Sequence, residues 1–231
     1  MKNNRWIFLS YELSPELSNY GGAKGITIDW LRRIDRGETS NNSSLKFPAH
    51  TGTHIDFPFH FLAEGNTGSE FEPHDLVFEY AVLVDIQYLN PSNYLIKPND
   101  LEKFISELSE KTELILFKTG FCYHRNEERY WKYNWGFAPE CASFLKSKFP
   151  QLRAIGFDLI SLTAFQQREI GRLAHKEFLG THHLLIVEDM DLRNVSSNDT
   201  FSTIIVSPLR FIGADGAPVT VWAHTTNETY D

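Results

Sequence analysis

The chain has 231 residues, enough for a single large domain with a sizeable core, and 42% of them are hydrophobic. Its formal net charge is −8 and it has no lysine or arginine run, which argues against a nucleic-acid partner. No stretch approaches the ~20 apolar residues of a membrane span, and no signal-peptide cleavage site follows the N-terminus. We therefore expect a cytoplasmic protein that does not enter a membrane.

The first element in chain order is a short strand at residues 6–9. Residues 14–44 are rich in glycine, serine and asparagine. We expect them to form an ordered but irregular region, a lid over a site, with a short helix near residues 29–35. Cys122 and Cys141 belong to no CxxC pair, and nothing in the sequence supports a disulfide between them.

A cluster of titratable groups follows in the segment FPAHTGTHIDFPFHF, at residues 47–61. It contains His50, His54, Asp56 and His60. Imidazole nitrogen and carboxylate oxygen form the ligand set that Zn²⁺ or Mn²⁺ takes up readily. The cluster therefore predicts a divalent metal site.

The backbone of this segment is predicted to bend. Gly52 and Pro58 oppose a helix, and a straight strand of six residues would span roughly 20 Å, too far for His50 and Asp56 to reach one ion. A bend at Gly52 would place His54 and Asp56 on one face of a strand that follows. Pro58 then stiffens the exit, which leaves His60 either as a further ligand or as an unligated acid or base.

The rest of the chain predicts strands alternating with helices, which indicates the α/β class with some antiparallel pairing. The helices are expected from residue 99 or 100 to about 109, with Leu101, Phe104, Ile105 and Leu108 on the apolar side, and from Pro139 to about 148. The expected strands cover residues 81–86, 113–117, 153–157, 184–187, 203–206 and 219–222.

Two further residues are candidates to complete the metal site. His175 lies in the helical-looking stretch LAHKEFLG, and Glu188 follows the apolar run LLIV at the end of a strand. A lone carboxylate at that place would be poorly solvated unless it is paired. On composition alone the alternatives stay open, namely a surface histidine on a helix and a solvated glutamate.

Several motifs then resemble one family. HTGTHIDFPFH closely resembles the HxGTHxDxPxH signature of the metal-dependent cyclase family, which includes bacterial kynurenine formamidases and isatin hydrolases. Weaker matches follow in the family's order along nearly the whole chain. They are Gly156-Phe157-Asp158 with Ser161, His175 with Leu179-Gly180, Ile186-Val187-Glu188, Ser207-Pro208-Leu209-Arg210 and Gly213 to Val219.

The resemblance implies a swivelling β/β/α fold with a mixed, barrel-like sheet and flanking helices, in one domain over residues 1–231 and usually in a homodimer or homotetramer. It implies that His50, His54 and Asp56 bind a first metal. Asp56 and Glu188 would bridge to a second metal held by His175, for which His182 and His183 are nearby competitors. His60 matches the catalytic acid or base.

The implied activity is metal-dependent hydrolysis of an amide, formamide or lactam carbonyl by metal-bound hydroxide, with one or two Zn²⁺ ions or Mn²⁺ as cofactor. The substrate would be a small molecule, an aromatic amide or lactam. The chain departs from the formamidases in an early segment, where SPELSNYGGAKG lacks their Pro-Gly-Asp. Tyr20 stands roughly where they carry a tryptophan, and we expect it to bind substrate.

Three alternatives to hydrolysis remain. One is metal-assisted cyclisation or dehydration at the same site. Another is a non-catalytic protein that uses the metal to bind an anionic ligand, against which the presence of His60 argues. The third is a cupin-type oxygenase, which the position of Pro58 and the α/β pattern disfavour.

Overall fold

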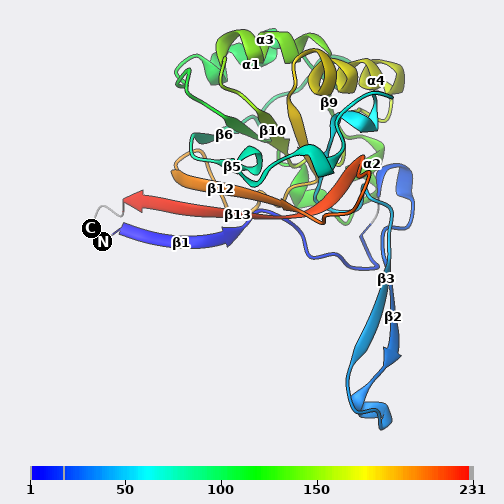
Figure 1. The fold of residues 1–231 in the computed structure, drawn as a ribbon. Coiled ribbons are helices and arrows are strands. Elements are labelled where there is room, and N and C mark those ends of the chain that lie inside the picture. The colour runs from blue at the N-terminus through cyan, green and yellow to red at the C-terminus, as the bar shows by residue number, and fades with distance from the viewer. Residues whose placement is uncertain (1, 18, 229–231) are drawn as a thin grey trace.

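The structure, a computed structural model, describes residues 2–17 and 19–228. Its centre is a mixed nine-stranded sheet in the order β5-β12-β13-β4-β11-β10-β8-β6, with β1 paired to β13 (Figure 1). The strands are β1 (Lys2–Phe8), β4 (His54–Asp56), β5 (Val77–Phe78), β6 (Ala81–Asp85), β8 (Leu114–Lys118), β10 (Ala154–Phe157), β11 (Leu185–Glu188), β12 (Phe201–Pro208) and β13 (Gly216–Glu228). The predicted α/β class is confirmed.

Strands β6, β8, β10 and β11 are parallel to one another and form the more buried half of the sheet. In β8, Leu114 and Leu116 pack into one hydrophobic cluster, whereas Ile115 and Phe117 pack into another on the opposite face. Because both faces are covered, these strands read as continuous apolar runs, which is typical of parallel sheets.

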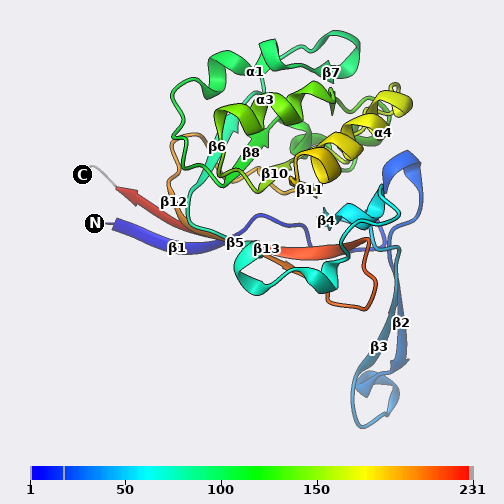
Figure 2. The same ribbon diagram turned by 45° about the horizontal axis from the view of Figure 1, so that its top comes forward.

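Helices cover one face of this half, as Figure 2 also shows. The short helix α2 (Glu128–Lys132) packs instead against the turn at Tyr20–Gly22. The covering helices are α1 (Pro98–Ile105), α3 (Glu140–Lys148) and α4 (Arg168–Lys176), and the last continues into a π-helical turn at Glu177–Thr181. A small parallel pair, β7 (Leu95–Ile96) and β9 (Gly136–Phe137), lies among them. Within the described residues, no helix is long and apolar enough to cross a membrane.

The short strand β4 joins the two halves of the sheet. It pairs antiparallel with β11 on one side and with β13 on the other. From β13 outwards all pairings are antiparallel, through β12 and β5 and through β1. Residues of β4 therefore lie where distant parts of the chain meet.

The helix predicted near residues 29–35 is wrong. This segment belongs to an antiparallel hairpin of β2 (Thr27–Arg32) and β3 (Asn42–Lys46), which projects from the body in both views (Figures 1 and 2). Thr27, Ile28 and Trp30 favour a strand, and helical geometry is confined to a single 3₁₀ turn at Ile34–Arg36. The hairpin extends away from the sheet, so this part of the predicted lid does not cover a site.

The other predicted elements are confirmed within a few residues, apart from β1, β12 and β13, which are longer than predicted. The thiols of Cys122 and Cys141 are both free and buried.

Candidate metal site

The histidine-rich segment bends as the sequence predicts. Gly52 has a φ of 63°, and a Cβ at this position would overlap the side chain of Leu13. In β4, immediately afterwards, His54 and Asp56 lie on one face of the strand while Ile55 points into the core between them. All three side chains are buried.

Glu188 and His175 approach this face from other elements. The register of β4 and β11 places Glu188 opposite His54, and their side chains are 3.3 Å apart, from Nε2 to Oε2. From α4, His175 brings its Nε2 to 3.5 Å from Asp56 Oδ2 and to 3.5 Å from Glu188 Oε1. The structure thus brings both second-half candidates to the cluster.

The competitors of His175 lie elsewhere. His182 faces Glu177, with 3.8 Å between Nε2 and Oε2. Within the described residues, neither His182 nor His183 belongs to a group able to hold a metal. The groups that can are His50 with His54 and Asp56, Asp56 with His175 and Glu188, and His50 with His60 and Asp215.

The hydrogen bonds of the histidines suit metal ligation. Nδ1 of His54 lies 2.8 Å from the carbonyl of Gly52, and Nδ1 of His175 lies 2.8 Å from the carbonyl of Gly171. Since a carbonyl only accepts, each Nδ1 carries the proton and donates it. Each Nε2 is then free to ligate, with the ring held by its second nitrogen as in known metal sites.

The environment of the Asp56 carboxylate shows whether a cation fits this site. Its Oδ2 is fully buried and has no hydrogen-bond partner among the described residues. A carboxylate oxygen left unpaired at that depth is costly. In the neutral imidazole Nε2 of His175 offers only a lone pair, so a cation between Nε2 and Oδ2 would satisfy both atoms. The donor set of imidazoles and carboxylates therefore fits a divalent metal.

The buried carboxylates of the cluster also favour positive charge beside them. Burial opposes protonation of His175, but the carboxylates of Asp56 and Glu188 outweigh it and raise its pKa to about 10. Burial likewise opposes protonation of His50, whose pKa Asp56 and Asp215 raise to about 9. Burial alone would raise the pKa of Asp56, but His175 and His50 hold it well below its usual range. In the metal-free protein, the protons bound to His50 and His175 thus supply positive charge, which a metal cation would replace.

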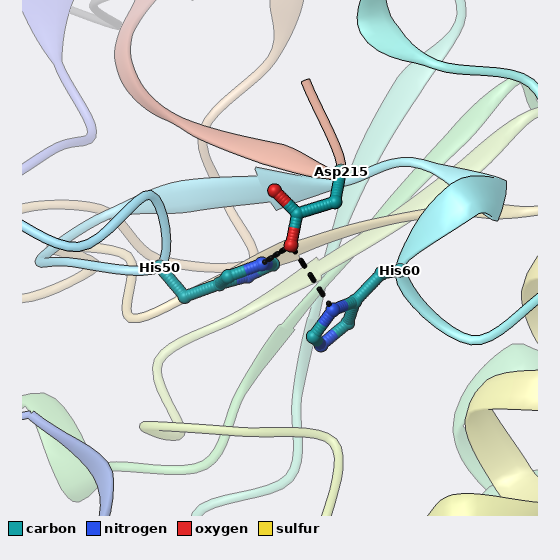
Figure 3. A group of neighbouring side chains, drawn as sticks. All are labelled: His50, His60 and Asp215. Atoms are coloured by element: carbon teal, nitrogen blue, oxygen red, sulfur yellow. Dashed lines mark hydrogen bonds and ion pairs between the residues drawn. The ribbon is translucent and has the colours of Figure 1, made fainter. Parts of the chain in front are cut away.

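Asp215 joins this site from the loop before β13, and Figure 3 shows its carboxylate between two imidazoles. Its Oδ2 lies 2.9 Å from Nε2 of His50 and 3.6 Å from Nδ1 of His60. The neighbouring Gly216 is needed for this approach, because a Cβ there would overlap the His50 ring. The sequence did not predict Asp215 as a site residue, because only the pairing of β13 with β4 brings it close to His50.

His60 differs from the other histidines of the segment. It ends a 3₁₀ turn that begins at Pro58, so the proline stiffens the exit from β4 as predicted. Its ring stacks on His50, with 4.0 Å between centroids. Burial lowers its pKa, the direction that keeps the imidazole neutral at pH 7.

A cavity of about 520 Å³ opens beside the cluster. Its lining includes His54, His60, His175 and Glu188, together with Tyr20 and Phe61. Tyr20, which we expect to bind substrate, lies at this cavity, and its ring packs against Phe165 at 5.7 Å between centroids. Arg168 and Arg172 also line the cavity, and sequence reasoning did not single them out.

Comparison with known proteins identifies relatives over nearly the whole chain. The family model described as "Putative cyclase" matches residues 7–164. A kynurenine formamidase of Bacillus cytotoxicus is 28% identical over 219 residues, which cover 95% of this chain and 97% of that protein. Cyclase-like protein 2 of Arabidopsis thaliana is 26% identical over 227 residues, covering 94% and 78% respectively.

Solved structures share the fold. Isatin hydrolase A from Labrenzia aggregata, bound to benzyl benzoate, superposes with a TM-score of 0.82 at 20% identity and covers 97% of this chain and 94% of its own. A structure titled as a potential metal-dependent hydrolase with cyclase activity gives a TM-score of 0.75 at 22% identity, covering 97% and 100%.

Proposed function

Because the chain belongs to the cyclase family, we propose that it is a metal-dependent hydrolase that cleaves the C–N bond of an amide, formamide or lactam. Relatives named kynurenine formamidase and isatin hydrolase support this activity. The observation that carries the proposal is the convergence of Asp56, His175 and Glu188, all buried, beside an open cavity.

We assign the ligands by their geometry. His50, His54 and Asp56 would hold one divalent ion, and Asp56, His175 and Glu188 would hold a second or share the first. Such a ligand set suits Zn²⁺ and Mn²⁺ alike. When bound, the ion supplies Lewis acidity, which lowers the pKa of water towards ~7 and polarises a carbonyl.

His60 is proposed as the acid and base of the reaction. Its Nδ1 faces Asp215, so this nitrogen would carry a proton while Nε2 stays free at the cavity. Nε2 would take a proton from the attacking water and deliver it to the leaving nitrogen, a contribution of roughly 10²–10⁴-fold. Asp215 would hold the ring in this tautomer.

The substrate is proposed to be a small aromatic amide, formamide or lactam. Tyr20 and Phe61 line the cavity beside the cluster, and the ring of Phe61 stacks on that of His175 at 4.3 Å. Flat apolar walls of this kind favour an aromatic ring next to the carbonyl that is attacked.

We further propose a homodimer or homotetramer that pairs through the β2–β3 hairpin. Ile28 pairs with Leu45 and Trp30 with Ser43, so Ile28, Trp30 and Leu45 share one face of the hairpin. Trp30 is 49% exposed and Leu45 is 55% exposed. A two-stranded hairpin is marginally stable alone in water, so a second copy covering this face would stabilise it.

The test of the activity combines elemental analysis with a panel of substrates. The purified protein should contain Zn or Mn and should hydrolyse at least one of formanilide and isatin. Dialysis against a chelator should abolish turnover, and the same metal should restore it. Metal without turnover on any carbonyl substrate would favour a binding protein and contradict the proposal.

A further inference from the structure

One face of α4 carries three residues that line the cavity. Arg168, Arg172 and His175 are spaced at i, i+4 and i+7, which places them on the same side of the helix. His175 is buried at the metal cluster, whereas both arginines are exposed. Seven residues of α-helix rise about 10 Å, so Arg168 lies two turns from the cluster along the cavity.

The two arginines differ in their partners. Arg172 forms an ion pair with Glu169, so its charge is compensated within the helix. No carboxylate lies within ion-pair distance of Arg168 among the residues the structure describes, and its guanidinium stacks on Phe165 at 4.2 Å from the ring centroid. Stacking occupies the face of a guanidinium but leaves its in-plane N–H groups free to bind a planar anion.

Tyr20 presents a second unused donor at the same edge. Its hydroxyl is buried, and no described residue accepts a hydrogen bond from it. Its ring packs on Phe165, the residue on which Arg168 stacks. Burial raises the pKa of Tyr20, and although the charge of the adjacent Arg168 guanidinium and its hydrogen bonding to the hydroxyl oppose that rise, the hydroxyl remains protonated at neutral pH. A buried donor without a partner is costly unless a ligand accepts from it.

The rest of the cavity lining is mixed in character. Phe61 and Ile160 supply apolar surface, and Ser161 and Thr163 supply hydroxyl groups. A carbonyl at the cluster and an anion at Arg168 would thus be separated by about the length that an aromatic ring with its substituents fills.

The geometry points to a carboxylate-binding end of the cavity, formed by the Arg168 guanidinium and the Tyr20 hydroxyl. This inference rests on the proposed function and specifies its substrate class, an aromatic amide or formamide whose ring also bears a carboxylate. Arg168 and Tyr20 are specificity residues in this assignment, and they take no part in breaking the bond.

The kinetic test compares matched probes on the metal-loaded enzyme. Formanilide is neutral, and 3- and 4-formamidobenzoate differ from it only by a carboxylate. We expect kcat/KM to be about 10- to 100-fold higher for one of the formamidobenzoates, and Arg168→Gln to remove this preference through KM while formanilide is unaffected. Tyr20→Phe should weaken the preference by a smaller factor.

Lys148→Gln is the matched control, because it removes one exposed positive charge from α3 and does not touch the cavity. It should leave both kinds of probe unchanged. Equal kcat/KM for neutral and anionic probes, or an equal loss for both in Arg168→Gln, would overturn the assignment while leaving the hydrolase proposal in place.

A binding measurement separates the two proposals. Titration of benzoate into the purified protein by calorimetry should show an affinity that falls about 10-fold or more in Arg168→Gln, whereas the affinity for benzamide should not change. Benzoate binding that depends on Arg168, without hydrolysis of any probe, would support the anion site and reject the hydrolase. Benzoate binding that is insensitive to Arg168 would reject the anion site.

Discussion

Oδ2 of Asp215 lies 2.9 Å from Nε2 of His50, although 165 positions separate the two residues in the chain. Nδ1 of the same imidazole lies 2.9 Å from Asp56 Oδ1. A histidine that donates one N–H to a carboxylate is held in place and is a stronger metal ligand through its other nitrogen. Asp215 therefore fixes the orientation of His50 from outside the proposed ligand set.

Asp215→Asn should weaken metal binding. The amide keeps the shape of the carboxylate but loses its charge, so we expect affinity for Zn²⁺ to fall about 10- to 100-fold. Competition of the metal-free protein against a chromophoric chelator measures this directly. Asp85→Asn is the control, since Asp85 is a half-buried carboxylate that only accepts hydrogen bonds from Gln87. Equal affinities of the wild type and Asp215→Asn would contradict the role of Asp215.

His60→Ala should separate metal binding from catalysis. We expect the variant to keep its metal and to lose roughly 10²–10⁴-fold in kcat, because His60 is assigned proton transfer and no ligation. Elemental analysis and steady-state kinetics on the same preparation decide the question. Loss of the metal together with the rate would make His60 a ligand instead.

His54→Ala should abolish metal content and turnover together. Removal of the imidazole takes away one ligand and leaves Glu188 facing a void. The exposed His74, which lies outside the three possible metal groups, provides the control in His74→Ala. A His54→Ala protein that retains full metal and full rate would refute the assignment of this ligand.

The metal-free protein should lose stability as the pH rises above neutrality. The folded-state pKa of His175 is about 10, against an ordinary value of 6.5, so its protonation stabilises the fold fully below pH 6.5. That contribution declines as pH rises and is lost above about pH 10. Thermal unfolding between pH 7 and 10 should show the decline in the metal-free wild type and a smaller one in His175→Gln.

The metal-loaded protein provides the comparison for this titration. A cation replaces the protons of the cluster, so the stability of the loaded protein should depend less on pH over the same range. Metal uptake should also release protons, which calorimetry in two buffers of different ionisation enthalpy measures. A stability of the metal-free protein that increases from pH 7 to pH 9 would contradict this account.

If the apolar face of the β2–β3 hairpin is the contact between copies, substitutions on it should change the oligomeric state. Replacing Trp30 and Leu45 with serine should convert a dimer or tetramer into smaller species, because it removes the apolar face that a second copy would cover. Light scattering after size-exclusion chromatography measures the mass. Tyr88→Ser, at a residue that is 98% exposed on the body of the protein, is the control. An unchanged mass in the double variant would reject the hairpin as the contact.

The features that could be predicted from the sequence are those that depend on neighbouring residues alone. Apolar runs such as LILF in β8 indicate buried strands, and Gly52 and Pro58 determine how the backbone enters and leaves β4. The hairpin was missed because residues 29–35 resemble a short helix and the polar residues at 37–44 resemble a loop, whereas its strands depend on pairing across residues 27–46. Asp215 was missed for a related reason, since only the register of β13 against β4 brings it to His50.

The two ends of the cavity are built from different parts of the chain. The candidate metal ligands lie where β4, β11 and the buried side of α4 meet, and any change there disturbs the centre of the sheet. Arg168 and the turn that holds Tyr20 lie at the periphery, where most side chains contact solvent on one side. Substitutions at the periphery can therefore change which substrate fits the cavity without disturbing the candidate metal ligands at the centre of the sheet.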